Sequence, residues 1–406
     1  MEMYLDESHR ALRDLVRDFA RQEIAPVAAE LDRTAEFPWE NVRGMADLGL
    51  LGIPWSPELG GAGMDTTACI VAIHEIAKVD ASHAITVSAH TTLGTGPIVV
   101  FGTDAQREKY VPLLASGRVL GGFGLTEPDA GSDAGGTRTT ARRVDGGWVL
   151  NGGKIFITHG GVGEVFVVTA ATDREQGPRG ISAFIVTKPT TDIETAERVG
   201  VGHSTELEFT GGVRAGKKED KMGWRASDTR ELYLEDAFVP DDQLLGGVGE
   251  GFTNFMRSLD TGRIGLAALS LGIAEGAFEQ SLAYATGRQQ FGRPISEFQA
   301  IQFMLADMKT GIEAAAHLVY HAAWLKDHGQ PYSREASMAK LFASELAMRT
   351  TTRAVQIHGG YGYMKEYPVE RMMRDAKICE IGEGTSEIQR LVIARSLVRD
   401  LNGVTE

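Results

Sequence analysis

The fold of this chain is decided at residues 145–168, which read DGGWVLNGGKIFITHGGVGEVFVV. Residues 148–150 and 165–168 are rich in β-branched and aromatic side chains, a composition that predicts strands. The Asp145-Gly146-Gly147 step before the first run is typical of a hairpin turn. This part of the chain is therefore expected to form β structure.

Helical sequence flanks this β stretch on both sides. Between residues 8 and 28, apolar side chains recur every three or four positions, as in a helix with one buried face. The same spacing returns in four long segments and a last helix: 252–286, 297–328, 333–358, 367–380 and from 387 onward. Short connections between long helices favour an antiparallel bundle. The order predicts an α+β chain with a helical domain at 1–120, a β domain at 121–240 and a helical bundle at 241–406.

Composition limits the classes of function. The chain has 406 residues, of which 43% are hydrophobic, and a net charge of −14. An excess of negative charge disfavours binding to nucleic acid or to an anionic membrane. No stretch approaches the ~20 apolar residues that cross a bilayer, and the N-terminus has no features of a signal or transit peptide. We therefore expect no nucleic-acid partner, no membrane span, and a location in the bacterial cytoplasm or, for a processed mature form, in the mitochondrial matrix.

Familiar cofactor and metal patterns are weak. The two cysteines, Cys69 and Cys379, lie far apart in the sequence, which fits a reducing compartment without disulfides. The glycine-rich residues 247–251 lack the spacing and the βαβ context of a dinucleotide fold. His317 and His321 share a helix face, but no glutamate follows the first histidine as in a zinc protease. We predict neither a Rossmann site nor a metal site.

The sharpest local signal is the stretch of residues 380–390, EIGEGTSEIQR. Glu383 stands between two glycines, so its backbone can take unusual angles. Ser386 and Gln389 predict a capping box that opens the following helix. On this local evidence Glu383 is either a catalytic carboxylate or a surface charge that satisfies the helix dipole.

Two further segments fit a ligand site. Residues 123–133, FGLTEPDAGSD, combine small residues and hydroxyls that let a planar or phosphorylated ligand approach the backbone. Residues 154–161, KIFITHGG, place one aromatic ring and one hydroxyl on a predicted strand. Taken alone, the first segment is equally a long turn and the second is ordinary core.

Taken together, in order and spacing, these segments resemble the acyl-CoA dehydrogenase family, and most closely its short-chain, butyryl-CoA type. The likeness covers almost the whole chain. It implies an N-terminal helical domain, a middle β-barrel-like domain, a C-terminal four-helix bundle and an FAD cofactor. The implied FAD contacts are Phe123, Leu125, Thr126, Gly131, Ser132, Phe156, Ile157, Thr158, Arg288, Phe291, Gln299, Gln356, Ile357, Gly359, Gly360, Thr385, Ser386 and Glu387.

The resemblance also assigns roles within the cofactor site. Phe156 would pack on the flavin, and Thr158 would form a hydrogen bond near the flavin N5. Residues 288–292 match a segment that reaches the FAD of a neighbouring subunit. The arginine of that segment would supply positive charge beside the pyrophosphate.

For the reaction, the resemblance implies that Glu383 removes the α-proton of an acyl-CoA thioester while the β-hydride passes to flavin N5. Burial would raise the pKa of this base toward neutral pH. The implied substrate contacts are Ser132, Asp260, Arg263 and Gly384, the last through a backbone N–H that polarises the thioester carbonyl. Some family members carry the base immediately before the arginine that matches Arg263. Here that position is Gly262, which cannot act as a base, so the sequence points to one base.

Three positions depart from close relatives. Gly382 stands where a tyrosine is common, which removes a ring from beside the substrate and could admit a branched acyl group. Phe156 replaces a tryptophan and His159 replaces an asparagine, and neither change affects the expected activity.

The implied partners are an electron-transfer flavoprotein and, in a homotetramer, further copies of the chain. Alternatives are an acyl-CoA oxidase, whose flavin is reoxidised by oxygen, and a flavin-bearing relative with a DNA-associated role. The acidic chain and the mixed charge of residues 387–406 disfavour the DNA-associated role.

Overall fold

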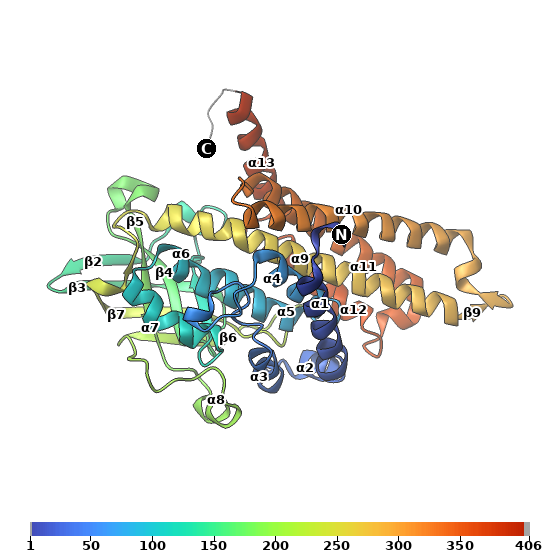
Figure 1. Cartoon of the computed structure of the whole chain (residues 1–406), viewed down its shortest axis with the longest axis horizontal. Helices are drawn as coiled ribbons and strands as arrows, with labels where there is room; N and C mark the ends of the chain where they lie inside the picture. Colours follow the sequence, from blue (N-terminus) through green and yellow to red (C-terminus); the bar gives the residue numbers. More distant parts are fainter. Residues whose placement is uncertain (1, 402–406) are drawn as a thin grey trace.

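The β sheet formed by the middle of the chain lies at one end of the molecule, beside helices from both ends of the chain (Figure 1). The computed structural model describes residues 2–401. Before the sheet lie η1 (Glu2–Tyr4), α1 (Glu7–Phe19), η2 (Ala20–Ile24), α2 (Ala28–Thr34), α3 (Trp39–Asp47), η3 (Pro57–Leu59), α4 (Thr66–Ala77), α5 (Ala81–Ser88), η4 (Ala89–Thr95), α6 (Gly96–Phe101) and α7 (Asp104–Ala115).

Residues 81–101, which form α5, η4 and α6, run as one helical path long and apolar enough to cross a membrane by length and composition alone. The expectation that no stretch approaches that length is therefore corrected. Most of this path, 83%, is buried inside the fold, as in the core helix of a folded protein. The apolar side chains are thus already covered by protein.

The β unit is an eight-stranded sheet with the order β6-β7-β3-β2-β4-β5-β8, and β1 pairs with β4. Its strands are β1 (Gly121–Gly124), β2 (Thr140–Val144), β3 (Gly147–Thr158), β4 (Val165–Ala171), β5 (Ile181–Thr187), β6 (Val213–Lys218), β7 (Thr229–Pro240) and β8 (Leu244–Leu245), with helix α8 (Ile193–Val199) between β5 and β6. The predicted hairpin turn is confirmed: Val144 pairs with Gly147 across Asp145 and Gly146, and Gly146 has a φ of 73°. A left-handed residue in a two-residue turn matches the twist of the two strands.

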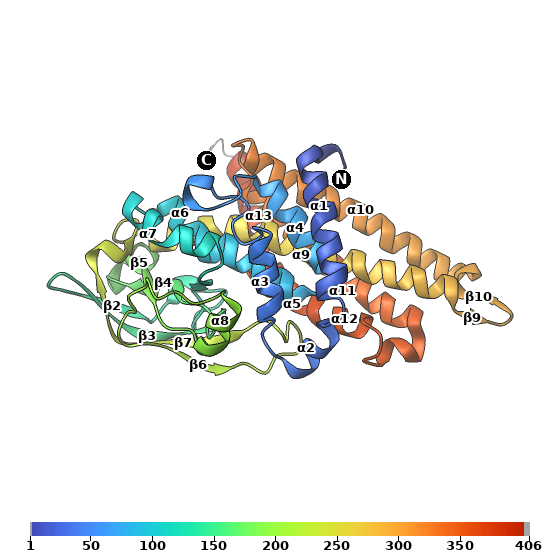
Figure 2. The same cartoon turned by 60° about the horizontal axis from the view of Figure 1, so that its bottom comes forward.

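The C-terminal part is a set of long helices in which α9 is central (Figure 2). It comprises α9 (Gly251–Gly287), the hairpin β9 (Gln289–Gln290) and β10 (Arg293–Pro294), α10 (Gln299–Asp327), α11 (Ser333–His358), η9 (Gly359–Tyr363), α12 (Val369–Cys379) and α13 (Ser386–Leu401). Small residues fill the buried faces of α9 and α11, which allows these two helices and α4 to pack closely. One end of α9 lies against the sheet, and its other end carries the β9–β10 hairpin (Figure 1).

The predicted helical and β segments all appear close to their expected positions. The predicted helix at 252–286 is α9, and the predicted strand at 165–168 lies within β4. The helical, β and helical order of the fold is confirmed by the structure.

Candidate active site

Glu383 lies in the short loop between α12 and α13, in a conformation that few residues adopt. Its φ is 54°, and that of the next residue, Gly384, is 91°. The left-handed region disfavours a residue with a Cβ, and such strain persists only where the surroundings enforce it. Two buried side chains hold this loop by its carbonyl oxygens. Gln389 Nε2 donates to the carbonyls of Glu383 (3.1 Å) and Gly384 (2.8 Å), and Lys340 Nζ donates to that of Gly384 (2.7 Å).

The carboxylate of Glu383 points into the protein. The residue as a whole is partly exposed, yet its Oε2 atom is covered and has no hydrogen-bond partner among residues 2–401. Burial raises the pKa of Glu383 to about 7, although the positive charges of Lys340 and Arg263 oppose the rise. A carboxylate with a pKa near neutral pH can accept a proton and later release it.

Helix α9 passes directly beneath this carboxylate at Gly262. A Cβ at position 262 would overlap Oε2 of Glu383 and lie 3.0 Å from Cδ2 of Leu93. Glycine is therefore required here by the close approach of the base, not by its own backbone angles. The next residue of α9, the buried Arg263, forms an ion pair with Asp260 (2.5 Å), three positions before it. The structure thus brings together Glu383, Gly384, Asp260 and Arg263.

The predicted capping box at α13 is corrected by the structure. The side chain that caps the helix is Thr385, whose Oγ1 accepts from the N–H of Ile388 (3.3 Å). Ser386 is already the first helical residue, and its Oγ is buried without a partner among the described residues. Gln389 reaches back to carbonyl oxygens instead of to a cap N–H, because the left-handed loop turns those carbonyls toward it.

The segment 123–133 begins beside the same helix. The ring of Phe123 stacks on Phe255 of α9, with centroids 4.1 Å apart. Phe255 precedes Gly262 by seven residues, or about 10 Å along the same helix face. Leu125 and Thr126 are partly exposed, Gly131 and Ser132 are exposed, and a Cβ at Gly131 would meet nothing within 4 Å. The segment therefore leaves its backbone open to a ligand at Gly131.

A buried ion pair fixes this segment to β3. Lys154 Nζ lies 2.6 Å from Glu127 Oε1, and both side chains are buried. Burial would raise the pKa of Glu127, but Lys154 and hydrogen bonds from Thr137 and Thr139 hold it at about 2. The N–H of Ile155 also donates to the carbonyl of Thr126 (2.9 Å).

Phe156 projects from β3 as an exposed aromatic platform. Its φ is 58° and 64% of its surface is exposed. The pairing of β3 with β7 shifts register between Lys154 and Ile157, and such a bulge re-aims a side chain. Ile157 points into the core of the β unit, so of this residue only the backbone could contact a ligand on that side. Thr158, at the end of the strand, is partly exposed.

The remaining predicted cofactor residues gather at the opposite end of α9. A cavity of about 480 Å³ lies there, lined by Tyr284, Arg288, Gln290, Ile295, Ile357, His358, Gly359, Gly360, Tyr361 and Met364. Gln299 and Gln356 are close in sequence to residues that line the cavity. Both are exposed, and neither lines the cavity itself. Phe291 occupies the left-handed turn of the β9–β10 hairpin and is 93% exposed. Arg263 and Arg288 are 25 residues apart on this helix, or about 37 Å, so one chain does not bring the two groups together.

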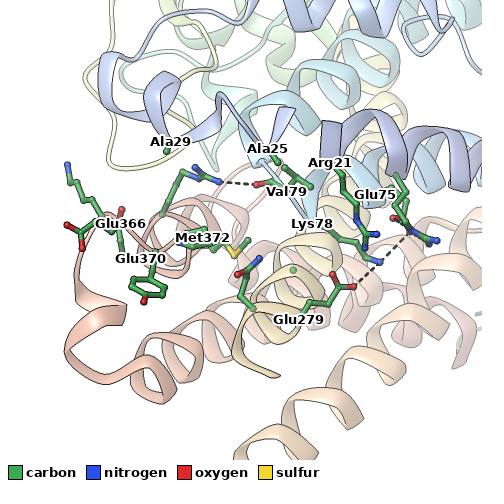
Figure 3. Close-up of a pocket in the computed structure, with 17 residues that line it drawn as sticks. Arg21, Ala25, Ala29, Glu75, Lys78, Val79, Glu279, Glu366, Glu370 and Met372 are labelled. Carbon is green, nitrogen blue, oxygen red and sulfur yellow. Dashed lines mark hydrogen bonds and ion pairs between the residues drawn. The ribbon is translucent and has the colours of Figure 1, made fainter. Parts of the chain in front are cut away.

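A second cavity, of about 460 Å³, lies between the N-terminal helices and α12 (Figure 3). Its charged side chains pair with one another: Arg17 with Glu75 at 3.0 Å, and Lys78 with Glu279 at 3.5 Å. None of the predicted site residues lines it. No group of three or more metal-binding side chains occurs in the part of the chain that the structure describes.

Sequence reasoning missed three residues of this site. Glu127 and Lys154 lie in the two predicted ligand segments but have no predicted role there, and Lys340 lies outside every predicted segment of the site. Lys340 had a readable signal, because it stands on the helix face otherwise made of Ala336, Ala343 and Ala347. A charged residue on an apolar stripe is expected to have a specific partner.

Comparison with known proteins agrees with this architecture. The family models for the N-terminal, middle and C-terminal domains of acyl-CoA dehydrogenase match residues 6–118, 122–237 and 249–398. The chain is 48% identical to the short-chain specific acyl-CoA dehydrogenase of Clostridium acetobutylicum, over 98% of this chain and 100% of that protein.

Solved structures give the same result. Butyryl-CoA dehydrogenase from Megasphaera elsdenii superposes with a TM-score of 0.91 at 45% identity, over 97% of this chain and 99% of that one. A chain in a structure of the electron transferring flavoprotein of Acidaminococcus fermentans also superposes with a TM-score of 0.91, at 48% identity over 98% of this chain and 99% of that one. This chain therefore belongs to the acyl-CoA dehydrogenase family.

Proposed function

We propose that this acyl-CoA dehydrogenase desaturates a short acyl-CoA, straight or branched, to a trans-2-enoyl-CoA, with Glu383 as the base. The observation that carries the proposal is the covered Oε2 atom of Glu383. This atom has no hydrogen-bond partner in the described part of the chain, and its carboxyl group has a pKa of about 7. A general base works best when its pKa lies near the working pH and its reactive atom is free to accept a proton.

The residues present fit FAD. Phe156 offers an exposed ring on which a planar ring system can stack. Gly131 leaves its backbone open to a ligand, and Arg288 lines a cavity large enough for part of a nucleotide. When bound, FAD supplies the acceptor for the hydride that leaves the β carbon.

The chain itself handles the proton. At pH 7 about half of the Glu383 side chains are ionised, since the pKa is about 7. The carboxylate would take the α-proton of the thioester, and the N–H of Gly384 would donate to the thioester carbonyl. That N–H has no acceptor within residues 2–401. A donor fixed in advance stabilises the negative charge that develops on the carbonyl oxygen.

The acyl group would lie beside Gly382. A Cβ at this position would lie 3.5 Å from the carbonyl oxygen of Ile378 and 4.0 Å from Cδ2 of Leu266, which are ordinary contacts. The backbone therefore does not require glycine, and the missing side chain leaves space next to the base. This space supports a short chain with room for a branch. Ser132, Asp260 and Arg263 would complete the substrate contacts.

The separation of the two groups of cofactor residues supports an assembly of several copies. Arg263, which lies near Glu383, and Arg288 are about 37 Å apart along α9. An FAD that contacts both Phe156 of the predicted flavin site and Arg288 would therefore lie between two chains. We place the FAD of one subunit against the β9–β10 hairpin and η9 of the next, within a homotetramer. An electron-transfer flavoprotein would reoxidise the reduced enzyme.

Anaerobic titration tests the function. The purified holoenzyme should be yellow, and butyryl-CoA or a branched short acyl-CoA should bleach it. Glu383→Gln should keep FAD and ligand binding and lose most of the bleaching rate. If no acyl-CoA of any length or branching bleaches the flavin, the proposed reaction is wrong. Rapid peroxide formation in air, without an electron-transfer flavoprotein, would identify an oxidase instead.

A further inference from the structure

The base loop has a buried cation beneath it. Lys340 of α11 has no exposed surface, and its Nζ donates to the carbonyl oxygen of Gly384 at 2.7 Å. Burial lowers the pKa of Lys340 to about 8, so most of these side chains still carry a charge at pH 7. A lysine is rarely buried unless it is paired, because removing the ammonium group from water is costly. Packing alone therefore does not explain why a lysine is buried at position 340.

The hydrogen bond from Lys340 to Gly384 supports the part of the loop whose backbone conformation is least favourable. Glu383 and Gly384 both have positive φ, and their carbonyls are turned inward to meet Lys340 and Gln389. Without these two donors the buried carbonyl of Gly384 would lose its partners, and the left-handed conformation of Glu383 would lose its support. Lys340 thus contributes to where the carboxylate points.

The charge acts on the same carboxylate. The titratable and charged groups around the base come from four helices. They are Asp260 and Arg263 on α9, Lys340 on α11, Cys379 at the end of α12 with Glu380 as its C-cap, and Glu387 on α13. Arg263 is already paired with Asp260, and Glu380 with Lys377 at 2.6 Å. Burial raises the pKa of the Cys379 thiol to about 12, so it stays neutral. Lys340 is then the cation that faces Glu383 without a carboxylate of its own within ion-pair distance in the described chain.

We propose that Lys340 is a positioning residue of the reaction: its ammonium group holds the Glu383–Gly384 loop in its left-handed form and keeps the buried base ionised in the neutral pH range. This inference rests on the proposed role of Glu383 as the base. It assigns two separable effects to one side chain, a hydrogen bond to the loop and a charge near the carboxylate.

Two substitutions separate these effects. Lys340→Gln keeps a donor of hydrogen bonds and removes the charge, whereas Lys340→Met removes both. An opposite charge at short range shifts the pKa of a carboxyl by about one unit or more. In both variants the rate of anaerobic flavin reduction by saturating butyryl-CoA should therefore reach its midpoint at least about one pH unit higher than in the parent. The rate of Lys340→Gln should return close to that of the parent at high pH, and that of Lys340→Met should stay low at every pH.

Lys188→Met is the matched control. Lys188 is also buried, donates to the carbonyls of Gly161, Gly163 and Pro189, and lies in the β unit. Its removal should lower the melting temperature and leave the midpoint of the pH profile in place. A Lys340→Gln holoenzyme that stays folded with an unshifted midpoint overturns the inference, as does an equal shift in Lys188→Met. If the parent enzyme is not bleached at all, or Glu383→Gln is as fast as the parent, the proposed function has failed instead.

Discussion

At the scale of single residues, the carboxylate of Glu383 fits against α9 only because residue 262 is a glycine. Oε2 of Glu383 occupies the position that a Cβ at residue 262 would need. Gly262→Ala should displace the carboxylate, and a displacement of about 1 Å at a reacting group can lower a rate by about a hundredfold. We expect that loss in the rate of anaerobic flavin reduction by butyryl-CoA.

Gly287→Ala is the control for this effect, because it makes the same change in the same helix where a Cβ meets nothing within 4 Å. This variant should fold and bleach like the parent. A Gly262→Ala enzyme that reacts at the parental rate would show that the carboxylate does not work from this position.

The pH dependence of the reaction is also expected to follow the ionisation of a single residue, Glu383. The base must be ionised to accept a proton, and burial raises the pKa of Glu383 to about 7. Below pH 7 the rate of flavin reduction should therefore rise about tenfold per pH unit, and above pH 8 it should level off. Stopped-flow reduction from pH 5.5 to 9 measures this profile. A rate that is constant from pH 5.5 to 8 would contradict an ionisable base with this pKa.

At the scale of elements, the predicted flavin-binding segment depends on the buried pair of Lys154 and Glu127, which ties residues 123–133 to β3. Lys154→Met leaves a buried carboxylate without its cation, so the free energy of unfolding should fall by about 3–5 kcal/mol. The affinity for FAD should fall with it. Thermal denaturation and FAD titration of the same preparations measure both effects.

Lys309→Met provides the comparison. Lys309 pairs with Glu313 at 2.6 Å on the exposed face of α10, and both side chains are about half exposed. Because water screens such pairs, this substitution should change the free energy of unfolding by less than about 1 kcal/mol. Equal losses in the two variants would mean that the buried pair has no special part in the fold.

The helices and turns also show which features of the structure could be predicted from the sequence. The helix of residues 252–286 and the Asp145-Gly146 turn were predictable, because apolar periodicity and turn chemistry are local properties. The resemblance to a known family then predicted Glu383 as the base. The contact of Gly262 with the base and the hydrogen bond from Lys340 could not be predicted, since both join segments more than 40 residues apart and depend on how α9, α11 and the loop pack. The cap at Thr385 was missed by one residue because a left-handed loop shifts the start of α13.

At the scale of the whole molecule, the predicted cofactor residues form two groups toward opposite ends of α9, a helix of 37 residues that spans about 55 Å. In a pair of copies related by a twofold axis, each contact occurs twice with the roles exchanged. Each FAD would then take Phe156 and Glu383 from one chain and Arg288 from the other. A single chain would hold no complete site.

This arrangement can be tested by mixing two inactive variants. Glu383→Gln removes the base, and Arg288→Ala removes the cation supplied to the neighbour. In a mixed pair one site carries both defects and the other carries neither. Random pairing at equal amounts makes half of the pairs mixed, so about a quarter of all sites should be intact. Co-expression with two different affinity tags and purification through both tags isolates the mixed oligomers. Turnover well above that of either variant alone is the expected result. Mixed oligomers that form but stay as inactive as their parents would mean that Arg288 serves the site of its own chain, and the shared cofactor site would have to be abandoned.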